Sequence, residues 1–187
     1  MNKKISHYLE LAARWHVFFL LFIYGSGKLL GGQFYRRGHL PDEIANTPLI
    51  ELSGFDLAWS FMGYSYGYIL FIGISQLLGA FLLLFEKTKL LGVLILIPIL
   101  TNIIVFDMIF FDKYGALASA ILYFLLLLLI LYFNKDKLKK AIQSLTYVKK
   151  EPTTFVIMEK WKTALIVALI IGIIFGVEQI FVNLLGH

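Results

Sequence analysis

Two cations bracket a strongly apolar segment near the start of the chain, and they are the residues there whose chemistry most needs explaining. Arg14 and Lys28 enclose residues 15–27, which are mostly aromatic and aliphatic. On a helix the two cations fall within about 40° of one line and about 21 Å apart along the axis. This separation is shorter than the hydrocarbon core of a bilayer, which is about 30 Å thick. A charge at such depth is costly and normally faces a partner or a polar cavity, so other segments should supply polar atoms.

The sequence offers such polar atoms at two depths. Near one membrane face, Glu10 precedes Arg14 by four residues, the order that suits an ion pair on a helix, and Glu86 is expected at a similar level. Near the other face, Lys28 is expected at the depth of Asp107. Opposite charges at one depth in a low dielectric should pair, so we predict a Lys28–Asp107 contact, direct or through water.

Further polar residues are expected between and beside these two layers. Gln76 and Asn102 fall near mid-membrane, where they could hydrogen-bond to each other between helices or contact the polar head of a bound molecule. Ser119 lies in a stretch of small residues that can pack tightly or line a cavity. The resulting candidates for a binding site or polar core are Arg14, Lys28, Gln76, Asn102, Asp107, Ser119 and Glu178.

Several kinds of chemistry are not expected. The chain has no cysteine, which excludes disulfides, dithiol relays and thiolate ligation of metals or iron–sulfur clusters. His16 is the only histidine well within an apolar segment and faces away from Arg14, so neither a haem held by two histidines nor a metal cluster is predicted. Phosphate-binding loops and nucleophile elbows are absent from the sequence. We therefore expect no catalytic residues and no intrinsic catalytic activity.

The elements that position these residues are transmembrane helices. With 187 residues, 59% of them hydrophobic, and a mean hydropathy of +0.81, the chain is typical of an all-α, polytopic membrane helical bundle. We predict a four-helix core over 1–133 with an outer loop at 32–62 that contains a short capping helix. A basic cytoplasmic connector, 134–162, and a fifth transmembrane helix within 163–187 follow. The predicted spans are about 8–31, 63–85, 89–111, 115–133 and 163–185.

Charge and small residues predict topology and partners. Lysines concentrate before the first span, between the second and third, and in the connector, which places the N-terminus inside and the C-terminus outside. The net charge of +5 therefore indicates a lipid bilayer rather than nucleic acid, and the connector should attract anionic headgroups. The inner half of the fourth span, rich in leucine, is expected to face lipid. A stripe of small residues can dock the fifth span on the other helices or mediate a homo-oligomer: Ala164, Ala168, Gly172 and Gly176.

Three segments of the chain resemble the DoxX-like family of small bacterial membrane proteins. They are Gly25-Ser-Gly-Lys-Leu29, residues 71–80 and residues 88–92, and the resemblance covers about 8–133. It implies a four-helix bundle in the bacterial cytoplasmic (inner) membrane. It also implies association, in some members, with quinone-linked oxidation of sulfur compounds or with other redox partners. Members commonly carry Glu where this chain has Gln76, so a proton-transferring role would fall to Asp107 or Glu178.

These observations lead to three functional hypotheses. The first is an accessory or anchoring subunit of a quinone-linked membrane redox assembly, with electrons carried by a redox partner subunit or a bound quinone. The second is a small-solute or lipid carrier that uses an outer-leaflet cavity, with Pro98 as a hinge; in both, Lys28, Gln76, Asn102, Asp107 and Ser119 form the cavity. The third is a membrane scaffold that binds no ligand.

Overall fold

The computed structural model describes residues 3–111, 114–147 and 157–185, and these are organised as helices joined by turns and one long loop. Residues 112–113, and residues 148–156 of the predicted basic connector with Pro152, lie outside the described residues. The elements are α1 (Lys3–Leu30), α2 (Asp42–Ala45), the 3₁₀ helix η1 (Leu49–Glu51), α3 (Gly54–Gly63), α4 (Tyr66–Leu84), α5 (Lys89–Phe110), α6 (Tyr114–Phe133), α7 (Lys135–Thr146) and α8 (Ile157–Leu185). The chain divides into two compact units, Met1–Leu145 and Thr146–His187.

Four of the described helices are long and apolar enough to cross a membrane: α4, α5, α6 and part of α8, with mean hydropathies of 2.0 to 2.6. They confirm the predicted all-α membrane bundle. The helix α1 has 28 residues, enough to span a bilayer, but it is not among the four. Arg14 and Lys28 lower its hydropathy, and both are buried within the bundle. That α1 crosses the membrane remains a prediction.

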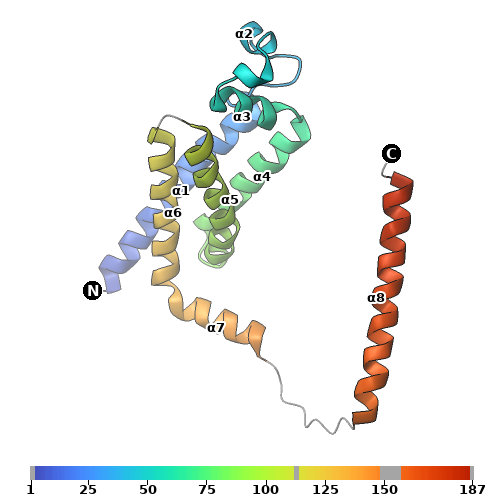
Figure 1. Ribbon diagram of the computed structural model, residues 1–187. Helices are drawn as coiled ribbons and strands as arrows, with labels where there is room; N and C mark the ends of the chain where they lie inside the picture. Colours follow the sequence, from blue (N-terminus) through green and yellow to red (C-terminus); the bar gives the residue numbers. More distant parts are fainter. Residues whose placement is uncertain (1–2, 112–113, 148–156, 186–187) are drawn as a thin grey trace. The chain divides into compact units, whose positions relative to one another are not determined.

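The first unit is built on a ring of four helices. Helix α1 packs against α4 and α6, α4 against α5, and α5 against α6, so each helix of the ring has two neighbours (Figure 1). Each contributes one apolar face to the core, for example Leu21, Leu83, Leu96 and Leu127, which are 0–2% exposed. The fully buried Leu127 corrects the expectation that the inner half of the fourth span faces lipid. Helices α1 and α5 both pack against α6, so part of its leucine-rich half is buried in the bundle.

A close backbone contact holds α4 and α5 together near the turn that joins them. A Cβ atom added to Gly92 would lie 2.7 Å from the carbonyl oxygen of Gly79, which is too short for any side chain to be accommodated without a shift. Two glycines facing each other let the helices approach as closely as small residues allow in membrane proteins. This contact lies at the end of the ring where Glu86 and Lys89 are found, which we call the turn end.

The opposite end of the ring is covered by the first loop, and we call it the α3 end (Figure 1). The short helix expected there is present as α3, which contacts α4 and α5. Ser53 caps it by accepting a hydrogen bond from the backbone N–H of Asp56 at 3.1 Å. The loop reaches α3 so closely that a Cβ on Gly63 would lie 1.8 Å from the carbonyl oxygen of Tyr35, so this position requires glycine. The loop is thereby fixed over the bundle.

Candidate functional site: a cavity with a buried ammonium

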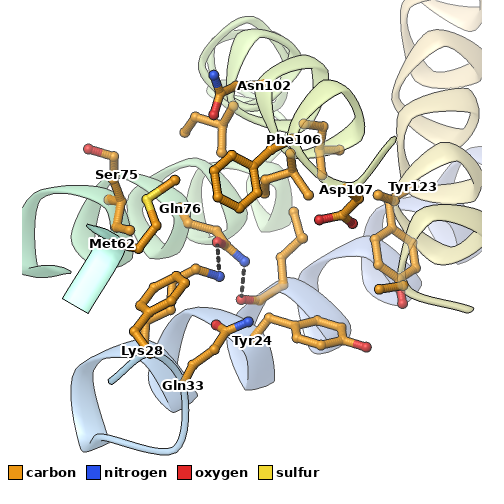
Figure 2. Close-up of a pocket in the computed structure, with 18 of the residues that line it drawn as sticks. Tyr24, Lys28, Gln33, Met62, Ser75, Gln76, Asn102, Phe106, Asp107 and Tyr123 are labelled. Carbon is orange, nitrogen blue, oxygen red and sulfur yellow. Dashed lines mark hydrogen bonds between the residues drawn. The ribbon is translucent and has the colours of Figure 1, made fainter. Parts of the chain in front are cut away.

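A cavity of about 590 Å³ opens among the helices in the half of the ring nearer α3. Its wall is mainly apolar and aromatic, with Phe34, Trp59, Phe106 and Phe111 among the lining residues. Trp59 contacts the rings of Phe34 and Phe111, with centroids 5.2 and 5.1 Å apart. Figure 2 shows polar side chains from α1, α4, α5 and α6 around it. The polar lining residues are Tyr24, Lys28, Gln33, Ser75, Gln76, Asn102, Asp107, Ser119 and Tyr123.

Lys28 places a buried ammonium group at this cavity. The residue is 7% exposed, and its Nζ donates a hydrogen bond of 3.1 Å to Oε1 of Gln76 (Figure 2). Gln76 is 1% exposed, and its Nε2 donates to the carbonyl oxygen of Leu21 at 3.1 Å. The amide is therefore held by α1 at both of its ends, which fixes its carbonyl toward the ammonium. An ammonium has three N–H donors, so Gln76 uses one of them and leaves capacity for a further acceptor.

Asp107 lies on α5 and is 6% exposed, but it does not pair with Lys28. Among the described residues Lys28 forms no ion pair within 4.0 Å, so the direct contact expected from the sequence is wrong. The physical reason is that Gln76, on the adjacent helix α4, reaches the ammonium first. Asp107 approaches the same cavity from α5, so that the two charges share the space without touching. A bridge through water remains a prediction.

Arg14 does not line this cavity; it lies at the turn end. The residue is 4% exposed, and its guanidinium donates hydrogen bonds to the carbonyl oxygens of Leu83 at 2.6 Å and Leu84 at 2.7 Å. The last carbonyls of a helix have no partner within it, so Arg14 caps the C-terminal end of α4. A third hydrogen bond, of 3.0 Å, goes to Glu86. Arg14 is thus assigned to helix packing, not to the cavity.

The expected Glu10–Arg14 pair is also replaced by other partners. The Glu10 carboxylate forms a buried ion pair with Lys89, the first residue of α5, and accepts a hydrogen bond of 3.0 Å from Asn134 at the end of α6. Lys89 additionally lies 2.6 Å from Glu86. Sequence reasoning missed Lys89 and Asn134, although both stand at helix ends at the same predicted depth as Glu10. These contacts join α1, α5 and α6 at the turn end.

Glu86 is far more exposed than its partners Arg14 and Lys89, with a side chain that is 58% exposed. Partial burial raises the pKa of its carboxyl group. The hydrogen bond and charge of Lys89, with contributions from Lys137 and Arg14, outweigh that effect and hold the pKa at about 2. Lys137 lies on α7, 3.3 Å from Glu86, so the carboxylate also connects the helix that follows the ring.

Of the seven residues proposed from the sequence, five line the cavity and two do not. Gln76 and Asn102 both line it, although the hydrogen bond considered between them is replaced by the Gln76–Lys28 bond. Ser119 lines it while its hydroxyl donates to the carbonyl oxygen of Gly115 at 3.0 Å. Glu178 belongs to α8 in the second compact unit and is not among the lining residues. Sequence reasoning missed the aromatic wall, whose residues carry no signal that distinguishes them from core.

Comparison with known proteins adds one similarity. No protein-family model matches the chain, and no solved structure gives a significant match. The chain is 37% identical over 110 residues to the uncharacterized protein YwoB of Bacillus subtilis (strain 168). The aligned stretch covers 57% of this chain and 66% of YwoB, just under two thirds of that protein. The name of YwoB assigns no activity, so the similarity transfers none.

Proposed function

We propose that this protein binds a membrane-dissolved amphiphile in its cavity and serves as an accessory or anchoring subunit of a quinone-linked redox assembly in the bacterial cytoplasmic membrane. The observation that carries the proposal is the ammonium of Lys28, which is buried at a cavity whose wall is mainly apolar and aromatic. Ionisable groups are rare within membrane helices because they are costly, and they commonly mark binding sites. A bound acceptor would use the donors that Gln76 leaves free.

The dimensions and lining of the cavity suit the head of a quinone. Small-molecule sites are usually about 300–1,000 Å³, mostly apolar, with a few placed polar groups. The flat ring of a quinone can stack against aromatic side chains such as Trp59 and Phe106, and its carbonyl oxygen can accept a hydrogen bond from Lys28. The resemblance to DoxX-like proteins supports the same ligand class. The chain itself then supplies binding and orientation, and electrons pass through the ligand and a partner subunit.

Access from the bilayer is consistent with the exposed lining residues. Phe71 on α4 and Pro98 and Asn102 on α5 line the cavity and are also exposed. Helices α4 and α5 are in close backbone contact at Gly79 and Gly92, toward the turn end, and both helices line the cavity nearer α3. An amphiphile could thus enter sideways from the bilayer with its tail remaining in lipid.

The proposal includes a topology. We place α1 as a further span, the N-terminus and the lysine-rich α7 on the cytoplasmic side, and the C-terminus outside, because lysines concentrate on the side retained in the cytoplasm. The α3 end, with the cavity, then lies in the outer leaflet. The small-residue stripe of α8 remains a proposed contact, either with the other helices or with a second copy of the chain.

Native mass spectrometry of the full chain, purified in its own lipids, tests the proposal. We expect a bound quinone that survives purification and is lost in Lys28→Met. The matched control is Lys137→Met, because this lysine is 61% exposed and does not line the cavity. Retention of the same quinone by Lys28→Met, or its absence from the wild-type protein, would contradict the proposal.

A carrier for a small solute or lipid is the second candidate, favoured by the position of Pro98. This residue lies inside α5 and lines the cavity, and a proline within a helix removes one backbone hydrogen bond and tends to kink it. Such a point can act as a hinge. Solute flux into proteoliposomes that is abolished by filling the cavity, as in Ser75→Trp, would favour transport over the accessory-subunit proposal.

A further inference from the structure

Lys28 and Asp107 carry opposite charges and line the same cavity, but they form no direct ion pair with each other. Both residues are buried, 7% and 6% exposed, and both line the same space. The ammonium of Lys28 donates one of its hydrogen bonds to Gln76. In the described part of the chain the side chain of Asp107 has no hydrogen-bond partner within the usual distance. Figure 2 shows the carboxylate of Asp107 directed into the cavity from α5. A ligand group that binds between the ammonium and the carboxylate must therefore accept a hydrogen bond from the first and donate one to the second.

We infer that the cavity selects a ligand head bearing a hydroxyl group, which accepts a hydrogen bond from Lys28 and donates one to Asp107. This inference rests on the proposed function and specifies its ligand class. A carbonyl oxygen has lone pairs but no proton, so it can satisfy the ammonium and not the carboxylate. A hydroxyl group satisfies both, and a hydrogen bond from O–H to a carboxylate is among the stronger ones in proteins.

The requirement discriminates between oxidation states of one molecule. A hydroquinone carries hydroxyl groups where the corresponding quinone carries carbonyl oxygens, while the ring and the tail are the same. A buried carboxylate facing a carbonyl oxygen would remain without a donor, which costs binding energy. The reduced form is therefore the preferred ligand. A hydroxyl-bearing lipid head, such as that of a monoacylglycerol, offers the same chemistry without the ring.

Equilibrium binding to the purified full chain tests this inference. The probes are a decyl-tailed benzoquinone, its hydroquinone kept reduced under anaerobic conditions, and a monoacylglycerol. We expect the hydroquinone to bind about tenfold or more tightly than the quinone, because one charge-assisted hydrogen bond is gained. In Asp107→Asn the ratio should fall to within about twofold, since an amide can accept from a hydroxyl group and donate to a carbonyl oxygen equally well.

The control is Asp136→Asn, an acid in the first turn of α7 that does not line the cavity, which should leave the ratio unchanged. Binding of the monoacylglycerol that weakens in Asp107→Asn, without binding of either quinone form, would support the hydroxyl head and reject the quinone of the proposed function. Equal affinities for the two oxidation states in the wild-type protein, or a ratio that persists in Asp107→Asn, would overturn the inference while leaving the proposed function standing. Absence of all binding would reject both.

Discussion

Replacing Arg14 by Met should destabilise the first unit more than any other single change of a charged residue at the turn end. The side chain is 5% exposed and makes three hydrogen bonds, two of them to the carbonyl oxygens of Leu83 and Leu84. Each hydrogen bond from a charged donor contributes about 1.5–3 kcal/mol. The contact with Glu86 adds little, because that carboxylate is 58% exposed and keeps Lys89 as a partner.

The expected loss in the free energy of unfolding is therefore about 3–5 kcal/mol. A loss of this size is also typical when one partner of a buried ion pair is removed. For a chain of this size it corresponds to a fall in Tm of about 6–20 °C. Arg14→Lys keeps the charge but has a single ammonium in place of the fork that reaches two carbonyl oxygens, so it should lie between the wild type and Arg14→Met.

Thermal unfolding in a mild detergent, followed by circular dichroism, measures these effects. Lys137→Met is the matched control, because its lysine is 61% exposed and also contacts Glu86; it should change the free energy of unfolding by less than about 1 kcal/mol. Unfolding of Arg14→Met at the wild-type temperature, or equal destabilisation of Lys137→Met, would contradict the capping of α4 by Arg14.

Three further predictions concern the turn end. Glu10→Gln should cost about 2–4 kcal/mol, because the buried ammonium of Lys89 loses a charged partner; chemical denaturation would measure it, and an unchanged midpoint would count against a buried pair. Gly92→Val should separate α4 from α5 at Gly79 and cost about 1–3 kcal/mol or more, which a thermal melt would detect, with the open position Gly115→Val as the control. The pKa of Glu86, about 2 instead of the ordinary 4.5, contributes stability that is fully present above about pH 4.5 and is lost as the pH falls toward 2. Glu86→Gln should flatten the stability–pH curve in that window, and an identical curve for the variant would be inconsistent with this assignment.

Much of the bundle could be predicted because hydropathy and charge report depth in a membrane. The α4, α5 and α6 helices begin and end close to the predicted spans, and Lys28 and Asp107, which were predicted at one depth, line one cavity. The short helix in the first loop followed from the mixture of apolar and acidic residues after Pro48.

The partners of individual charges could not be predicted, for two physical reasons. Depth does not fix the rotation of a helix about its axis, so the sequence could not show that Gln76 would reach Lys28 before Asp107 did. Backbone acceptors are present at every residue and leave no trace in the sequence, so the capping of α4 by Arg14 could not be foreseen. The leucine run of α6 likewise has no polar residue to mark which side is buried, so the burial of Leu127 in the core could not be predicted.

The affinity of the Lys28→Met variant for the ligand decides whether the buried ammonium holds the head of a membrane-dissolved molecule. Isothermal titration of the decyl-tailed hydroquinone would compare wild type, Lys28→Met and Lys137→Met. We predict a loss of affinity of about tenfold or more for Lys28→Met alone, as expected for one hydrogen bond to a charged donor, with all three proteins folded. Equal affinity of Lys28→Met and the wild-type protein would contradict it.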